Sequence, residues 1–183
     1  MAPDPQPPTS IDQIGQEAYR VIFPTDLLPG METALLLFCA GFWGKNDGIF
    51  VFEAGVARVT GIDMDAERIA QMRVLYPIEN WHLFVNDVYQ WTEATLMHDD
   101  HRTWDVVILD PALTQMGRCH EAIPDWCSLA ARTVIMGTDQ DTVDGYNLQA
   151  LSSPFVPDGW EITRVTRRNE IAHWVVLQKV GDR

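Results

Sequence analysis

Three aspartates closely follow short apolar runs, and the strands of an α/β sheet end at such positions. They are Asp63, Asp87 and Asp110, and the runs before them span 59–62, 81–85 and 104–109. The carboxyl ends of parallel strands meet at one edge of a sheet, and α/β proteins bind their ligands there. A carboxylate at this edge can accept hydrogen bonds from two ribose hydroxyls. The spacing therefore predicts a site for a nucleotide-like ligand.

A glycine-bearing turn precedes the first of these aspartates. Residues 35–40 form an unbroken apolar run, as expected of a buried central strand. Gly41 and Gly44 follow, with Phe42 and Trp43 between them. Glycines in such a turn allow the backbone to approach a ligand closely. The turn and Asp63 are therefore expected to lie on the same side of the ligand.

The apolar periodicity and the turn residues place these groups on a regular alternation of strands and helices. The sequence predicts an α/β fold, doubly wound, with a mostly parallel seven-stranded sheet and a C-terminal antiparallel hairpin. Residues 1–9 are expected to be a disordered proline-rich tail, and residues 10–183 a single domain with an N-terminal helix from about Ile11. The expected strands are 35–40, 59–62, 81–85, 104–109 and 133–136, closed by Gly137, and then 161–166 and 172–179. The expected helices are 48–57, 66–76, 88–97, one from about Pro124 as its first residue, and 141–151.

Composition limits the classes of protein to consider. The chain has 183 residues, 46% of them hydrophobic, a formal charge of −13 and a pI of about 4.5. This charge repels nucleic acid at long range, although a local basic patch can override it. Three unpatterned cysteines predict reduced thiols, and no signal peptide or membrane segment is evident. We therefore expect a cytoplasmic globular protein.

Four segments, in order along the chain, resemble the motifs of the class I S-adenosylmethionine-dependent methyltransferases. The resemblance covers roughly residues 33–179, and the terminal hairpin is also a family trait. The segments are Ala40-Gly41-Phe42-Trp43-Gly44, Gly61-Ile62-Asp63-Met64-Asp65, Asn86-Asp87-Val88 and Asp110-Pro111-Ala112-Leu113.

The resemblance implies a role for each of these positions. The turn around Gly41 would lie under the methionine part of S-adenosylmethionine, and Asp63, next to Met64, would bind the ribose hydroxyls. Asp87 would accept from the adenine amine, while the Val88 amide would donate to a ring nitrogen. Asp110 and Pro111 would face the transferred methyl group and the substrate. Alignment of the nucleophile and removal of its proton then carry most of the rate.

The chain departs from the family pattern in two of the four motifs. Cys39 stands where the family has an acidic residue, and Phe42 and Trp43 stand between the two glycines. In the fourth motif, Ala112 and Leu113 replace a second proline and an aromatic residue that stacks on a base in methyltransferases acting on adenine or guanine amines. Stacking is worth about 1–3 kcal/mol per base, so the loss of this aromatic residue weakens the case for a nucleic-acid acceptor.

Structural roles compete with the ligand roles. Asp63 could be a solvated carboxylate near a helix N-terminus, although Asp65 could serve as the cap of that helix. Asp87 could equally be the N-cap of the helix after it. A metal site is not predicted, because neither the segment 98–101 nor Cys119, His120 and Cys127 has the paired spacing of zinc ligands.

The sequence therefore predicts an S-adenosylmethionine-dependent methyltransferase acting on a nitrogen or oxygen nucleophile. The strand-end pair Asp110-Pro111 favours a nucleic-acid base as acceptor, while the acidic charge favours a small molecule. Two other classes stay open. One is a methyltransferase fold that has lost catalysis and serves as a binding or regulatory module, and the other is a nucleotide-dependent oxidoreductase, which the terminal hairpin disfavours.

Overall fold

A computed structural model describes residues 23–40, 44–98, 101–109, 119–139, 156–167 and 172–181. The predicted tail, the helix expected from Ile11 and the helix expected over 141–151 lie outside the described residues. The same holds for Gly41, Phe42, Trp43, Asp110 and Pro111.

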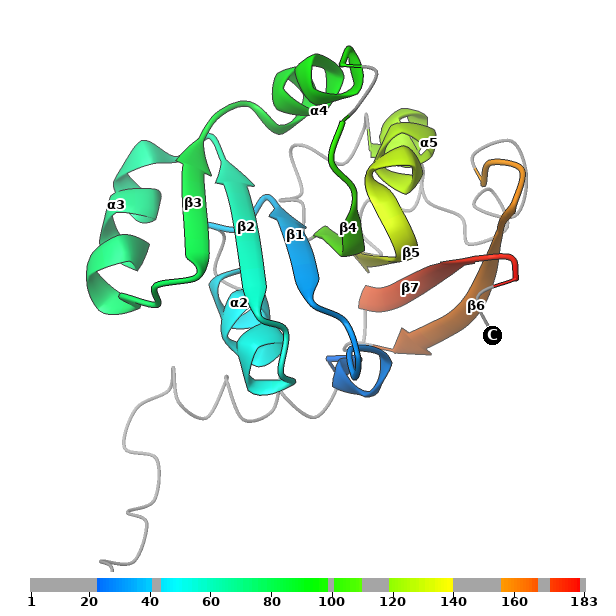
Figure 1. The fold of residues 1–183 in the computed structure, drawn as a ribbon, viewed down its shortest axis with the longest axis horizontal. Helices are drawn as coiled ribbons and strands as arrows, with labels where there is room; N and C mark the ends of the chain where they lie inside the picture. Colours follow the sequence, from blue (N-terminus) through cyan, green and yellow to red (C-terminus); the bar gives the residue numbers. More distant parts are fainter. Residues whose placement is uncertain are drawn as a thin grey trace, which may run out of the picture.

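The described strands form one seven-stranded sheet in the order β3-β2-β1-β4-β5-β7-β6 (Figure 1). The first five pair in parallel, whereas β7 pairs antiparallel with both β5 and β6. The predicted doubly wound sheet with a C-terminal antiparallel hairpin is thus confirmed. The strands are β1 (Thr33–Leu37), β2 (Arg58–Asp63), β3 (Trp81–Val85), β4 (Trp104–Leu109), β5 (Ala130–Asp139), β6 (Trp160–Arg167) and β7 (Ala172–Lys179).

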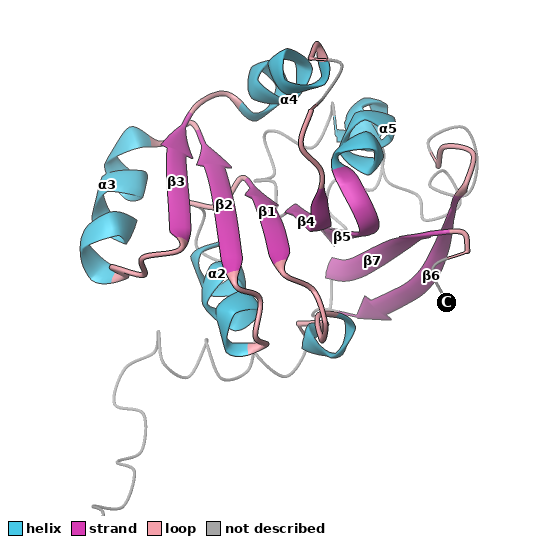
Figure 2. Cartoon of the chain, in the orientation of Figure 1, coloured by secondary structure: helices cyan, strands magenta, loops and turns pink. Residues whose placement is uncertain are grey.

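Helices cover both faces of the sheet (Figure 2). Side chains alternate along a strand, so each central strand supplies both cores. Leu35 and Leu37 pack with α4 and α5, while Ala34 and Leu36 pack with α2 and α3. The helices are η1 (Thr25–Leu27), a single 3-10 turn, α2 (Gly44–Glu53), α3 (Ala66–Leu75), α4 (Val88–Leu96) and α5 (Cys119–Leu129).

Asp105 joins the two central strands at their starts. Its Oδ2 accepts from the backbone amides of Glu32 and Thr33, at 2.8 and 2.9 Å, and from the Thr33 hydroxyl at 3.1 Å. Burial alone would raise the pKa of Asp105, but these hydrogen bonds and the charge of Arg132 outweigh burial and lower it. These hydrogen bonds hold the start of β1 beside the start of β4.

The termini of several elements differ from the predictions. Strands β3 and β4 match the predicted ranges, whereas β1 ends at Leu37, before the predicted Ala40. Phe38 has a left-handed φ of 61°, which turns the chain out of the strand. Helix α2 then begins at Gly44 rather than Gly48, so the turn between strand and helix is short.

Two predictions on the second half of the chain are wrong. Pro124 lies inside α5 rather than at its first position, because the helix begins five residues earlier, at Cys119. The missing N–H of Pro124 costs one helical hydrogen bond, which the burial of Ile123 and Trp126 offsets. Gly137 does not end β5, because the strand continues in antiparallel pairing with β7, where Gly137 lies opposite Trp174.

Gly48 of α2 lies against the indole of Trp81, and this contact yields a stability prediction. A Cβ at position 48 would overlap Cζ2 of Trp81. The indole is 6% exposed and packs against Phe52 and Tyr76, at centroid distances of 5.9 and 6.2 Å, so it has little room to move. Gly48→Ala gains up to about 1 kcal/mol of helix propensity, but overpacking costs about 1–3 kcal/mol.

We expect Gly48→Ala to be destabilising overall, with a lower urea midpoint and an unchanged m-value. The double variant Gly48→Ala, Trp81→Phe should recover most of the loss, because the smaller ring makes room for the methyl group. A single variant as stable as the parent protein would contradict the close packing.

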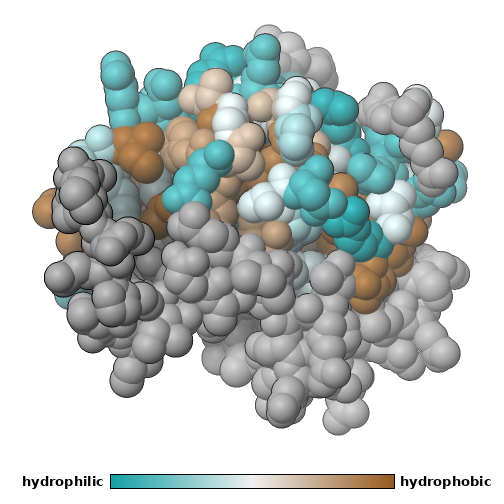
Figure 3. Space-filling view, turned by 90° about the horizontal axis from the view of Figure 1, so that it is seen from below, coloured by the Kyte–Doolittle hydropathy of each residue, from teal (hydrophilic) through white to brown (hydrophobic). Residues whose placement is uncertain are grey.

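None of the helices that the structure describes combines the length and the hydropathy that a membrane span requires. On the described part of the face in Figure 3, apolar side chains occur in separate groups between hydrophilic ones.

Candidate functional site

The predicted site lies at the carboxyl edge of the sheet, where β1, β2 and β3 end side by side (Figure 1). Of the predicted residues, the structure describes Ala40 after β1, Asp63 and Met64 at the end of β2, and Asp87 and Val88 after β3. Gly44 is the first residue of α2.

Asp63 holds the ends of two strands together. Its Oδ2 accepts from the backbone amide of Ala40 at 2.8 Å, and its Oδ1 accepts from the amide of Asp65 at 2.9 Å. Its carbonyl accepts from the amide of Asn86 at 2.9 Å, so the chain after β3 is anchored at the same point. The side chain is 9% exposed, and the alternative of a solvated carboxylate is therefore wrong.

These bonds leave Asp63 able to bind a ligand. An ionised carboxylate offers about four acceptor positions, and two amides occupy only two of them. The two amides also orient the carboxylate rigidly. Asp63 thus fits the ribose hydroxyls of the implied cofactor, and this role stays a prediction.

Asp87 is the N-cap of α4, which was one of the two roles predicted for it. Its Oδ1 accepts from the amide of Gln90 at 2.9 Å. Asp65 caps α3 in the same way, accepting from Arg68 at 3.0 Å. Capping and ligand binding can coexist in Asp87, because the capping bond uses one acceptor position of the carboxylate.

The other described positions differ in accessibility. Ala40 and Val88 are buried, at 5% and 3% exposure, so they can offer a ligand backbone groups more readily than side chains. Met64 is 58% exposed at the same edge of the sheet. Its flexible thioether could pack there against a planar ring of a ligand, such as an adenine.

The burial of Cys39 explains one departure from the family pattern. The thiol is 1% exposed. Burial, followed by the negative charge of Asp63 and then that of Asp47, raises the pKa of Cys39 well above its usual value. Asp47, itself 1% exposed, lies in the first turn of α2, where the helix dipole favours a carboxylate. This chain therefore carries its second buried acid on α2 instead of at position 39.

Replacing Cys39 by aspartate tests this explanation. Cys39→Asp would add a third carboxylate between two buried ones, so we expect a loss of about 3 kcal/mol or more at neutral pH. A Cβ added at Gly61 would lie 2.8 Å from Sγ of Cys39, so the thiol occupies the space that the missing side chain of Gly61 leaves. Cys39→Ser, close in size and uncharged, is the matched control and should stay near the parent in urea unfolding. Equal midpoints for the two variants would contradict the explanation.

An aromatic cluster fastens the turn after β1 to the helices above it. Phe38 contacts Tyr89 of α4 and Trp126 of α5, at centroid distances of 5.9 and 6.3 Å. Tyr89 and Trp126 also contact each other, at 6.0 Å. These contacts offset the left-handed φ of Phe38, which costs on the order of 1 kcal/mol or more in a bulky residue. The sequence carries no local signal for this role.

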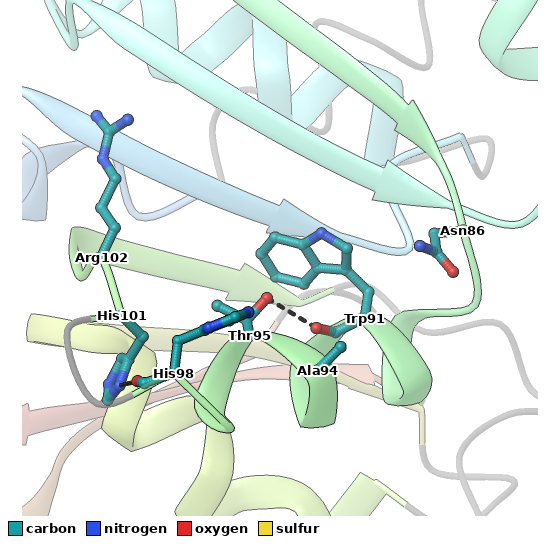
Figure 4. Close-up of a pocket in the computed structure, with 7 residues that line it drawn as sticks. All are labelled: Asn86, Trp91, Ala94, Thr95, His98, His101 and Arg102. Carbon is teal, nitrogen blue, oxygen red and sulfur yellow. Dashed lines mark hydrogen bonds between the residues drawn. The ribbon is translucent and has the colours of Figure 1, made fainter.

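Helix α4 separates two surface hollows that the sequence did not reveal as sites. One, of about 400 Å³, runs along Trp91, Ala94 and Thr95 of the helix and continues to His98, just after it (Figure 4). The other, of about 300 Å³, lies between α4 and α5 and is lined by Tyr89, Thr92, Glu93, Glu121, Ala122 and Asp125. The spacing i, i+3, i+4, i+7 from Trp91 to His98 is the sequence signal that could have shown the first hollow.

No group of three or more potential metal ligands comes together in the part of the chain that the structure describes. Asp99 and Asp100, from the segment 98–101, lie outside it, as do the side chains of Cys119 and His120. Cys127 is 2% exposed, and burial raises its pKa to about 12, so its thiol is inert at neutral pH.

Comparison with known proteins gives matches at the level of structure. No protein-family model matches the sequence, and no curated protein matches it. Among solved structures, a proposed methyltransferase from Escherichia coli, yhhF, is similar with a TM-score of 0.63 and 14% identity, over 94% of this chain and 89% of that one. Magnesium protoporphyrin IX methyltransferase from Synechocystis, with bound S-adenosylmethionine, gives 0.57 and 15%, over 96% and 86%.

A proposed RNA methyltransferase from Pyrococcus horikoshii is similar with a TM-score of 0.59 and 12% identity, over 91% of this chain and 82% of that one. These likenesses cover more than nine tenths of this chain. At such low identity they establish the fold only, and the reaction has to be argued from the residues of the site. The chain has the fold of the class I S-adenosylmethionine-dependent methyltransferases.

Proposed function

We propose that the protein is an S-adenosylmethionine-dependent methyltransferase acting on a nitrogen or oxygen nucleophile. The observation that carries the proposal is the placement of Asp63 and Asp87 at the ends of the adjacent strands β2 and β3, with Asp63 hydrogen-bonded to the turn after β1. One solved protein of this fold holds S-adenosylmethionine. The proposal also places the protein in the cytoplasm, in agreement with its cysteine usage.

In this proposal, each residue at the carboxyl edge of the sheet contacts a different part of the cofactor or the acceptor. Asp63 accepts from the ribose hydroxyls, while Asp87 and the Val88 amide read the adenine. The turn from Ala40 through Gly41, Phe42 and Trp43 to Gly44 supports the methionine part. S-adenosylmethionine would supply an electrophilic methyl group on its sulfonium. The Asp110 carboxylate and the Pro111 carbonyl, which follow β4, orient the acceptor by hydrogen bonds, and Asp110 takes its proton.

Two kinds of acceptor fit this arrangement. The Asp110-Pro111 pair favours an amino group on a nucleic-acid base, and a proposed RNA methyltransferase shares the fold. The formal charge of −13 favours a small molecule, and a porphyrin methyltransferase shares the fold as well. We favour the nucleic-acid base, because the strand-end pair acts locally on the acceptor whereas net charge acts at a distance.

A binding or regulatory module without catalysis is the second candidate. It is favoured by the absence of an acid at Cys39 and by the bulky Phe42 and Trp43 in the glycine turn. A nucleotide-dependent oxidoreductase is a third candidate, and the antiparallel β6–β7 hairpin disfavours it.

Calorimetric titration separates these candidates. We expect S-adenosylmethionine and S-adenosylhomocysteine to bind with micromolar affinity, because Asp63 is already oriented by two amides. NADH, the control ligand, should give no heat. Absence of heat with either sulfur ligand at millimolar concentration would refute the enzyme and favour the binding module, and binding of NADH alone would favour the oxidoreductase.

A further inference from the structure

The two hollows beside α4 differ in the chemistry of their described side chains. The one between α4 and α5 is lined by the carboxylates Glu93, Glu121 and Asp125. The one on the other flank is lined by His98, His101 and Arg102, and none of the described residues that line it is acidic. Asp99 and Asp100, which stand between the two histidines in the sequence, lie outside the described residues. We call this second hollow the basic hollow, after the side chains that the structure describes.

We propose that the basic hollow binds one nucleotide of a single-stranded nucleic acid, with the base on Trp91 and the phosphate at Arg102 and the two histidines. The inference rests on the proposed function, because it names the class of the methyl acceptor. It goes beyond that function in assigning a binding site to residues outside the four motifs.

The indole of Trp91 supplies a surface for a base. It is partly buried and contacts Trp104 beneath it, at a centroid distance of 5.9 Å and an interplanar angle of 54°. Trp104 is 5% exposed, and its Nε1 donates to the hydroxyl of Thr60 at 3.4 Å, so it gives Trp91 a fixed support. A supported ring loses little conformational freedom when a base stacks on it.

Basic groups lie at one end of this ring. In Figure 4, Trp91 occupies the middle of the hollow, with Asn86 at one end and His98, His101 and Arg102 at the other. The guanidinium carbon of Arg102 lies 5.8 Å from the centroid of the Trp104 ring, which holds the charge close to the two tilted rings. The N–H edge of the guanidinium stays available for a phosphate.

The histidines are arranged to contact a ligand through one nitrogen. Nδ1 of His101 lies 3.2 Å from the carbonyl oxygen of His98 and donates to it, since a carbonyl can only accept. Nε2 of His101 is then left to accept from a ribose hydroxyl or, once protonated, to donate to a phosphate. Thr95 does not contribute a free donor, because its hydroxyl already donates to the carbonyl of Trp91 at 2.8 Å.

The hollow lies next to the proposed cofactor site. Asn86 lines it, and Asp87 is the following residue, at the same end of β3. A volume of about 400 Å³ lies in the range of pockets for small ligands, into which a single nucleotide falls. A strand held here would run along α4, from Arg102 before the start of β4 toward Asn86 after β3.

Fluorescence anisotropy with the full chain tests the site. The probes are fluorescein-labelled ten-nucleotide RNAs of adenosine only and of uridine only, with AMP, inorganic phosphate and a blunt RNA duplex as competitors. We expect the single strands to bind. Trp91→Leu should weaken binding about tenfold or more through lost stacking. Arg102→Gln should weaken it several-fold and flatten the salt dependence by about 0.7 in log–log slope, as for one phosphate contact.

Arg164→Gln is the matched control for charge. Arg164 is an exposed arginine on β6, at the other edge of the sheet, where it pairs with Asp26 at 2.7 Å. Its removal changes the net charge as Arg102→Gln does, and the affinity for RNA should stay the same. The urea unfolding midpoint of each variant is measured as well. His98→Gln replaces an exposed side chain and so provides a second test that does not depend on the packing of Trp91.

Several results would overturn the proposal. They are the absence of any anisotropy change, parental affinity in both Arg102→Gln and His98→Gln, and competition by AMP or by the duplex as strong as that by the single strand. Calorimetry with S-adenosylmethionine on the same preparations distinguishes the two proposals. If the cofactor binds and the RNA does not, the basic hollow fails as a site while the proposed methyltransferase stands.

Discussion

Asp63→Ala should abolish tight binding of S-adenosylmethionine and also reduce stability. Two ribose hydroxyls would lose a charged acceptor, which amounts to roughly 100-fold in affinity at about 1.5 kcal/mol per bond. The amides of Ala40 and Asp65 would lose their acceptors as well. That second loss costs about 2–4 kcal/mol of folding free energy, or roughly 5–15 °C in Tm for a chain of this size.

The two effects can be measured separately. Affinity is measured by calorimetry well below the Tm of the variant, and stability by urea unfolding. The matched control is Asp65→Ala, which removes the cap of α3 and costs about 1 kcal/mol. It should leave affinity within a few-fold of the parent. If Asp63→Ala lowers stability but leaves affinity unchanged, Asp63 has only the structural role seen in its hydrogen bonds, and the ribose assignment is wrong.

Asp110→Ala should abolish methyl transfer and leave cofactor affinity unchanged within about threefold. Asp110 is the residue after Leu109, where the central strand β4 ends. A carboxylate that orients an acceptor and takes its proton contributes about 10²–10⁴-fold to the rate. It touches no part of the cofactor in the proposed arrangement. Transfer is measured with tritiated S-adenosylmethionine and single-stranded RNA as acceptor, and affinity by calorimetry.

The conservative variant Asp110→Asn makes this test sharper. In methyltransferases with a related fourth motif, asparagine can occupy this position, since its carbonyl also accepts from an amine. We therefore expect Asp110→Asn to keep part of the activity that Asp110→Ala loses. Retained turnover in Asp110→Ala would refute a catalytic role, and weakened cofactor binding would show that Asp110 belongs to the cofactor site instead.

Strands and helices with strong periodicity were predictable from the sequence. Strands β3 and β4 match residue for residue, and α3 begins at Ala66 as predicted, because Asp65 is a good N-cap. The C-terminal hairpin follows from two alternating runs around a polar turn. These features depend on neighbours in sequence, so local patterns suffice to predict them.

Contacts between distant residues decided the features that were missed. β1 ends early because Phe38 turns toward Tyr89 and Trp126, which are 51 and 88 positions away. β5 passes through Gly137 because β7 continues to pair with it. Helix α5 includes Pro124 because its apolar face is buried against the sheet. In each case tertiary packing outweighs a local preference worth about 1–3 kcal/mol.

The sequence by itself determined the fold class and the three strand-end aspartates, since the carboxyl ends of parallel strands must meet at one edge. It did not determine what surrounds them. Only the tertiary structure decided that Asp63 is buried and bonded to the turn after β1, and that Cys39 lies near two buried carboxylates. It also decided that Trp91 of α4 and Arg102, which precedes β4, line a single hollow. Hydrogen bonding, burial and charge depend on distances between residues far apart in the chain, and those distances exist only once the chain is folded.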